Sequence, residues 1–436
     1  MQTEELSQSQ KFFLRLKEQS ILQDSKGPLK GFRDRAWDHF SELGLPEKKQ
    51  EAFQYIPLRQ LYAQHFINAV STIGKDEVAD LPILPECRKS CLVFVNGFYR
   101  EDLSNLSALP KQVVVLSLDQ AMPTYGSFLQ NRIGKALKEE TDPFATLNAA
   151  LHGLGAFLYV PPKITIDVPI QCLYVITSNA VQTLVAPRVH LFLGASSTIH
   201  WISQTCSYAQ APVMVSAFMD VALEDGADFN LTHILQNDSG AWHFDALRAT
   251  LKRNSNLKSI AITTGAASVR QDYQIALTGE NSNADLKGVW MLSGQRQAHT
   301  HIVMDHQAPH CRSMQLFKGI VNDSSQSSFE GKILVRPKAQ KTQAYQLNNN
   351  MIIGEHAIAN CKPNLKIFAD DVKASHGATV AKLDPAQLFY LKSRGITEES
   401  AKTLLILGFC KEVIDQIPMP LIREEMTAMA RRYFHE

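Results

Sequence analysis

The densest group of metal-ligand side chains lies between residues 299 and 311. Two of its histidines, His299 and His301, are two residues apart, so a β-strand would point both to one face. A metal centre needs three or four converging donors, and imidazole with thiolate would suit zinc or iron. The spacing matches no known template, so we favour structural or solvent-facing roles over a metal site. The full group is His299, His301, His306, His310 and Cys311.

His376 is a second candidate ligand, because its neighbours Ser375 and Gly377 are small enough to leave the ring accessible to a metal or to sulfide. The β-branched segment before it predicts an extended strand that ends at a small polar loop holding His376. A helix is predicted directly afterwards. Taken by itself, a single histidine in a loop favours a structural role.

Three further patterns favour structural interpretations. Asp370 and Asp371 are adjacent, and a strand would send them to opposite faces, so a loop-shaping role is favoured over a carboxylate pair. The run Asn348-Asn349-Asn350 predicts a stacked amide ladder inside a β-helix, with ligand contact as the alternative. The spacing of Cys87 and Cys91 fits no zinc template, which favours ordinary apolar packing.

Nucleotide and hydrolase motifs are absent from the sequence. It contains no GxxxxGK[ST] phosphate loop, no GxSxG, no HExxH and no Rossmann fingerprint. If ATP is involved, we therefore expect another chain to bind it.

Composition narrows the class of protein. The 436 residues predict two or three domains, and 45% hydrophobic residues suffice for a large core. A net charge of +1 gives no steering toward nucleic acid or anionic membrane. No apolar run approaches the roughly 18 residues that span a bilayer, and the polar N-terminus does not resemble a signal peptide. Seven scattered cysteines favour a reducing compartment, so we expect a cytoplasmic protein.

The first 152 residues are predicted to be mainly helical, with two short strands at 91–95 and 113–118. Residues 1–75 favour helices, one of which should stop at Gly44-Leu45-Pro46. Residues 127–152 also show a helical apolar pattern. From about 156 to 375 the pattern changes to short alternating runs separated by small polar turns near 195, 226, 281 and 325. This pattern predicts an all-β body, either a β-helix or a large sandwich.

The C-terminal tail is predicted to be helical. Asp384 suits an N-cap, Pro385 a first turn and Gly395 a helix stop, and Thr397 should cap a second helix. A tail of about 50 residues cannot own a large core, so we expect it to dock on the β body, on a partner, or on both. Its candidate partner-binding residues are Leu404, Leu405, Phe409, Ile422 and Met426.

Ordered motifs along most of the chain resemble the SufB/SufD family, whose members form the scaffold of the SUF iron–sulfur cluster assembly system. The likeness is strongest after residue 279 and is closer to the SufD side. The matching stretches are GLPEKKQEAFQYIPL (44–58), GENS (279–282), DHQAPHCRSMQLFKGI (305–320), QLNNNMIIG (346–354), KPNLKIFADDVKASHGAT (362–379) and LFYLKSRGI (388–396).

The resemblance implies a mainly β fold, with a right-handed parallel β-helix core at 153–382 between helical regions at 1–152 and 383–436. It also implies a non-catalytic scaffold subunit that pairs with a SufB-like homologue. The C-terminal helices would bind a SufC-like ABC-type ATPase. His376 would be a ligand of a transient Fe–S cluster at the subunit interface, with a thiolate from a SufB-type cysteine. No cofactor is expected in the isolated chain, which could form a homodimer.

Two departures from the family pattern bear on the site. The family's usual cysteine two residues before the histidine is Ala374 here, so a thiol at that position cannot be essential. Where SufB-like chains carry their key cysteine, this chain has Leu347-Asn348-Asn349, which argues for SufD rather than SufB. The alternatives are a β-helix enzyme acting on polysaccharide and a metal-dependent hydrolase using the histidines at 299–311.

Overall fold

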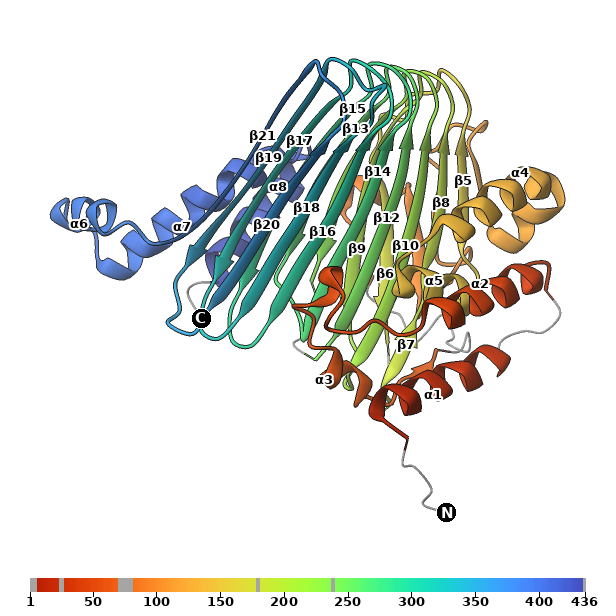
Figure 1. Ribbon diagram of the computed structural model, residues 1–436, viewed down its shortest axis with the longest axis horizontal. Helices are drawn as coiled ribbons and strands as arrows, with labels where there is room; N and C mark the ends of the chain where they lie inside the picture. Colours follow the sequence, from red (N-terminus) through yellow and green to blue (C-terminus); the bar gives the residue numbers. More distant parts are fainter. Residues whose placement is uncertain (1–5, 23–26, 70–80, 178–180, 237–239, 434–436) are drawn as a thin grey trace.

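The computed structural model describes residues 6–22, 27–69, 81–177, 181–236 and 240–433. Most of them wind alternately through two long sheets, here called sheet A and sheet B, that lie face to face (Figure 1). Consecutive coils pair in parallel, which confirms the predicted β-helix core. Sheet A contains β5 (Ala156–Val160), β7 (Thr183–Val185), β8 (Arg188–Leu193), β10 (Val213–Leu223), β12 (Trp242–Leu251), β14 (Ser268–Leu277), β16 (Gln297–His306), β18 (Gln326–Val335) and β20 (Ile358–Ile367). Sheet B contains β6 (Ile170–Ile176), β9 (Thr198–Ser207), β11 (Asp228–Leu235), β13 (Asn256–Thr263), β15 (Asn283–Leu292), β17 (Arg312–Val321), β19 (Thr342–Ile352) and β21 (Val372–Lys382).

Alternation along each strand explains why these residues form a solenoid. Every second side chain points between the sheets, where Val, Leu, Ile and aromatic residues make one continuous core. Side chains that pair from coil to coil are about one turn apart, such as Lys252 with Glu224, separated by 28 residues, and Arg336 with Asp305, separated by 31. A repeat of this length matches two strands and two turns per coil.

The turns fall into two columns, one at each end of the strands. Gly226 N–H donates to the Arg253 carbonyl and Asn254 N–H to the Glu280 carbonyl, which stacks successive turns of one column. Ser324 N–H bonds the Gly294 carbonyl in the other column. The predicted turns near 195, 226 and 281 lie in the first column and the one near 325 in the second. Their irregular spacing in the sequence follows from this division.

The N-terminal region is helical as predicted, but its strands extend both sheets of the solenoid. Strand β2 pairs with β6, β4 pairs with β5, and β1 pairs with β7. The predicted boundary at 152 therefore falls within a continuous pair of sheets. The strands are β1 (Ile67–Asn68), β2 (Cys91–Val95), β3 (Phe98–Tyr99) and β4 (Val114–Ser117), and the helices are α1 (Gln8–Leu22), α2 (Lys30–Leu43), α3 (Leu58–Tyr62), α4 (Leu118–Glu139) and α5 (Pro143–Leu151), with single 3-10 turns at Glu51–Phe53 and Pro85–Cys87.

Local sequence accounts for several helix ends in this region. Helix α2 stops at Gly44, whose φ of 69° suits glycine. The helix predicted over 127–152 is in fact two, because Asp142 accepts hydrogen bonds from Phe144 N and Ala145 N and starts α5 with Pro143 in its first turn. Helices were also predicted as far as residue 75. Between residues 51 and 69, however, the chain forms only short turns, α3 and β1. Residues 70–80 lie outside the described residues.

The tail forms α6 (Pro385–Ser393), α7 (Glu398–Ile414) and α8 (Pro420–Tyr433). Asp384 and Thr397 cap α6 and α7, and Gly395 has a φ of 83°, as predicted. Helices α7 and α8 pack on the outer face of sheet B, whereas α6 has no buried residue and projects away from the sheets (Figure 1). Within the described residues, every helix is too short or too polar to cross a lipid bilayer.

Candidate functional site at the open end of the solenoid

His376 lies within strand β21 and not in the predicted loop. The backbone of β21 pairs with β19 without interruption from Val372 to Lys382, and His376 is in register with Gln346. Small residues leave the strand conformation open, and parallel pairing with β19 satisfies its backbone groups. The loop prediction was wrong because the pairing partner lies about 30 residues earlier in the chain, beyond the reach of local pattern.

The side chain of His376 points to the inner side of sheet B, between the two sheets. In-register residues of parallel strands share a face, and Gln346 is buried inside the solenoid. The next residue, Gly377, faces outward, since a Cβ there would lie 3.2 Å from the side chain of Leu347. Ala374, two residues earlier, packs on the interior core. His376 is nevertheless exposed, because no described coil stacks on β20 and β21.

Amide side chains of β19 form the floor of this open end. The Gln346 Nε2 group donates to Gln315 Oε1 at 2.9 Å in the preceding coil. Asn350 Nδ2 donates to Asn348 Oδ1 at 2.8 Å, and Asn348 Nδ2 donates to the Phe317 carbonyl. The expected ladder of stacked asparagines is thus replaced by a network along one strand, because Asn349 points outward.

Cys361 of β20 lies against this floor from the opposite sheet. Its Sγ is 2.9 Å from Asn348 Oδ1 and 3.1 Å from Asn350 Nδ2. Sequence analysis missed Cys361. Residues two apart in a strand share a face, so Cys361 and Pro363 could have been assigned to the same inward-facing side. The open end therefore presents an imidazole from sheet B and a thiol from sheet A.

The histidines at 299–311 do not converge on one point. His299 and His301 share the outer face of sheet A, as predicted, but each bonds a different partner. His299 Nδ1 is 2.8 Å from Ser328 Oγ, and His301 Nδ1 is 2.5 Å from Asp272 Oδ1. His306 points inward and contacts Ser313 Oγ at 2.8 Å.

The remaining two residues of that group lie in a turn. His310 occupies a left-handed position with a φ of 61°, and Cys311 is buried beneath it against Ser282 Oγ. Burial lowers the pKa of His299 to about 3 and that of His306 to about 4, so both are neutral at pH 7. Among the described residues no three His, Cys, Asp or Glu side chains are grouped to hold a metal ion. The side chains of this group therefore make separate local contacts, and His310 faces solvent.

Two further sequence interpretations agree with the structure. Asp370 and Asp371 lie in the bend before β21, where Asp371 N–H donates to Gln340 Oε1 at 2.9 Å. Cys87 and Cys91 are fully buried, and burial raises the pKa of each thiol to about 12. These residues shape a turn and fill a core.

The candidate partner-binding residues of the tail divide into two groups. Ile422 and Met426 are buried against the isoleucines of sheet B, so they attach the tail to the solenoid and cannot contact a partner. Leu404 is 50% exposed, and Leu405 and Phe409 are partly exposed. The correction follows from docking of α8 on the body, which turns its apolar stripe inward.

Helix α6 carries two strongly exposed aromatic residues, and sequence analysis did not select them. Phe389 is 72% exposed and Tyr390 is 56% exposed. We define the tail surface as Phe389, Tyr390, Leu404, Leu405 and Phe409. Large exposed apolar side chains close together are typical of protein-binding surfaces.

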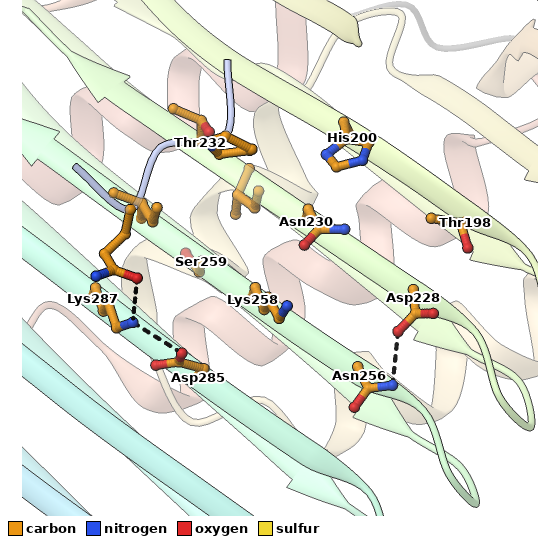
Figure 2. Close-up of a pocket in the computed structure, with 14 residues that line it drawn as sticks. Thr198, His200, Asp228, Asn230, Thr232, Asn256, Lys258, Ser259, Asp285 and Lys287 are labelled. Carbon is orange, nitrogen blue, oxygen red and sulfur yellow. Dashed lines mark hydrogen bonds and ion pairs between the residues drawn. The ribbon is translucent and has the colours of Figure 1, made fainter. Parts of the chain in front are cut away.

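A polar groove of about 440 Å³ crosses the outer face of sheet B beside the α7–α8 loop (Figure 2). Asn256 Nδ2 donates to Asp228 at 2.7 Å, and Lys287 Nζ contacts both Asp285, at 3.1 Å, and Gln416, at 3.3 Å. Together with Lys258, the groove is lined by two lysines and two aspartates. Their charges balance, so the groove favours neither an anionic nor a cationic ligand. It lies on the face of sheet B opposite to His376.

Comparison with known families and proteins agrees with this architecture. The family model described as SUF system FeS cluster assembly, SufBD core domain, matches residues 174–409, and that of the SufBD protein N-terminal region matches residues 5–172. An iron-sulfur cluster assembly SufBD family protein of Synechocystis is 32% identical over 415 residues, which cover 93% of this chain and 91% of the relative. The iron-sulfur cluster assembly protein SufD of Escherichia coli is 28% identical over 402 residues, covering 90% of this chain and 91% of the relative. The chain belongs to the SufBD family of the SUF iron–sulfur cluster assembly system.

Proposed function

We propose that this chain is a SufD-like scaffold subunit that pairs with a SufB-like homologue, binds a SufC-like ATPase, and contributes His376 to a nascent Fe–S cluster between the two homologues. The observation that carries the proposal is the place of His376. It is exposed, and its side chain faces the open end of a solenoid whose family assembles such clusters.

The open end is suited to pairing with a homologue. Strands β20 and β21 are the last of their sheets, so each has one edge of backbone N–H and C=O groups without a neighbouring strand in the described chain. The last coil and the neighbouring strand β19 expose apolar side chains, which a partner could cover. They are Leu347, Ile358, Ile367, Phe368 and Val380. A related solenoid end could add strands to this edge by β-augmentation.

The tail surface is suited to binding the ATPase. Helix α6 is held only by its neighbours along the chain, and its aromatic residues project into solvent, whereas α7 is fixed to the body. Lys318 of β17 donates to the Phe409 carbonyl at 3.2 Å and pairs with Glu412, which anchors α7 on sheet B. Because α7 is fixed to sheet B and α6 projects from it, this pair of helices is suited to transmitting motion from an ATPase to the solenoid.

The role that we propose for His376 is to coordinate iron of the nascent Fe–S cluster. A neutral imidazole has one ring nitrogen free to bind iron. The chain has no phosphate-binding loop, so ATP hydrolysis belongs to the partner. We infer that the chain is non-catalytic and that, when isolated, its open end accommodates a second copy. A cytoplasmic location remains a prediction.

The test is reconstitution of the three-component complex with His376→Ala. Cluster assembly, followed by Fe–S absorbance, should fall sharply, while pairing and ATPase binding persist. The matched control is His356→Ala, because His356 is exposed in the turn before β20 of the same coil but does not lie on the inner face. A normal cluster yield with His376→Ala would refute the ligand assignment. A yield that falls only in proportion to thermal stability would make His376 a packing residue.

A further inference from the structure

The polar groove on the outer face of sheet B has the size of a small-molecule site. Its volume is about 440 Å³, and ligand pockets usually measure about 300–1,000 Å³. The floor consists of outward-facing side chains of four neighbouring strands, β9, β11, β13 and β15 (Figure 2). One wall is the loop between α7 and α8, which contributes Gln416 and Pro418. The groove therefore lies at the border between the helix-covered half of this face and the open half.

Strand register places one row of polar side chains across the floor. The row consists of His200, Asn230, Lys258 and Asp285, one from each strand. Because neighbouring strands lie about 4.8 Å apart, Lys258 and Asp285 bring opposite charges side by side. Asp285 contacts Lys287 at 3.1 Å instead of Lys258. Lys258 itself has no ion-pair partner among the described residues.

Both charges of this row are open to a ligand. Lys258 is exposed, and the side chain of Asp285 is 24% exposed. Burial is the main cause that lowers the pKa of His200, and the positive charge of Lys258 lowers that pKa further. His200 is therefore neutral at pH 7, with one ring nitrogen as a donor and one as an acceptor. The row thus offers one cation, one anion and neutral polar groups between and beside them.

The lining narrows the class of ligand. The charges of the groove balance as a whole, so a ligand that carries both a positive and a negative group fits it better than a simple ion. The amides of Asn230, Asn256 and Gln416 and the hydroxyl of Thr198 add hydrogen-bonding groups. The described lining residues include no Phe, Tyr or Trp, so a nucleobase would find no ring on which to stack.

We propose that this groove binds a free polar α-amino acid as its zwitterion. The carboxylate of the ligand lies at Lys258, its ammonium group lies at Asp285, and its polar side chain meets the amides of Asn230 and Gln416. An α-amino acid suits the row because both of its charges are attached to one carbon atom, and the two charged residues lie on adjacent strands. Binding is non-covalent and needs no co-reactant. The proposal is independent of the role of His376, which points to the opposite side of sheet B.

The experiment is calorimetric titration of the full-length isolated chain with L-glutamine, L-serine and L-threonine. At least one of them should bind, and Lys258→Met and Asp285→Asn should each raise its dissociation constant about tenfold or more, because each removes a charged hydrogen-bonding partner. The matched controls are Lys252→Met and Asp225→Asn, which remove exposed charges from the first column of turns. Both controls should leave the dissociation constant unchanged.

Capped forms of the best-bound amino acid test the zwitterion without any variant. The N-acetylated acid lacks the ammonium group and the amino-acid amide lacks the carboxylate, so both should bind the wild-type chain about tenfold more weakly or worse. Equal binding of either capped form would overturn the proposal. So would an unchanged dissociation constant in Lys258→Met, or the absence of binding by all three amino acids at millimolar concentration.

Discussion

The two ends of the solenoid differ in how far other parts of the chain cover their terminal strands. At the first end, β6 is buried along its whole length and is extended by β2 and β3, while β4 extends sheet A and α4 follows directly. At the last end, no residue of β20 or β21 is fully buried. The N-terminal helices also lie over sheet A near the first end (Figure 1).

Buried ion pairs attach the N-terminal helices to the outer face of sheet A. Arg270 of β14 pairs with Asp142 at 2.6 Å and with Asp272 at 3.0 Å, and its guanidinium lies over the ring of Phe53. Asp142 is also the N-cap of α5, so one carboxylate serves both the helix and the sheet. The comparison shows that one end is covered by strands and helices of the same chain. The other retains an exposed edge, which a solitary protein would be expected to blunt.

The largest expected effect is acid destabilisation of the covered body. Burial is the main cause that lowers the pKa of six histidines below 6.5, so the folded chain binds fewer protons than the unfolded chain as pH falls. Each histidine then removes about 1.4 kcal/mol of stability per pH unit below about 6.5. The raised pKa values of the buried Asp142 and Asp245 act in the opposite sense and offset part of this loss. The histidines with a lowered pKa are His190 (to about 4), His243 (to about 3), His299 (to about 3), His306 (to about 4), His152 and His200.

Urea unfolding at pH values between about 7 and 5 checks this expectation. The free energy of unfolding should be greatest near neutrality and fall by several kcal/mol on acidification. A stability that does not change with pH over this range would mean that these histidines bind protons equally in the folded and unfolded chains.

The next largest effect is expected from Arg270→Ala, which leaves Asp142 buried without its main counter-charge and Asp272 with Arg248 as its remaining arginine partner. Removal of one partner from a buried network costs about 3–5 kcal/mol. Arg253→Ala is the control, because Arg253 pairs with Asp225 at 3.4 Å on the exposed surface and should cost about 1 kcal/mol or less. Equal losses in the two variants, measured by urea unfolding, would contradict the role assigned to the buried network.

His306→Ala should have an intermediate effect. It removes the contact with Ser313 Oγ and leaves a cavity inside the coil of β16 and β17, at a cost of about 1–3 kcal/mol. Cluster assembly by the complex should fall only as far as folded protein is lost. A strong loss of cluster assembly at unchanged stability would mean that His306 takes part in cluster assembly directly, as proposed for His376.

The smallest effect on stability is expected at the open end. Val380→Lys should change the free energy of unfolding by about 0.5 kcal/mol or less but abolish pairing with the SufB-like subunit, because a buried lysine would lack a partner there. Val181→Lys is the matched control, since both valines are 49% exposed. Pull-down and unfolding of the two variants decide the matter. Normal pairing by Val380→Lys would move the interface elsewhere.

The sequence by itself determined the features that depend on neighbouring residues. Asp384, Pro385, Gly395 and Thr397 set the ends of α6 and α7 where the pattern predicted them, because caps and turns form between residues close in the chain. Alternation identified the β body, and ordered motifs identified the family. The helix stop at Gly44 and the strand at Cys91–Val95 were also found at the predicted positions.

Only the tertiary structure decided which of these features face one another. Strand pairing between residues about 30 apart turned the expected loop at His376 into β21, brought Cys361 beside Asn350, and dispersed the histidines at 299–311. Docking on sheet B buried Ile422 and Met426 and left Phe389 exposed. The physical reason is that burial depends on the surface that covers a side chain. In a solenoid that surface belongs to the next coil or to a distant helix, which local sequence does not specify.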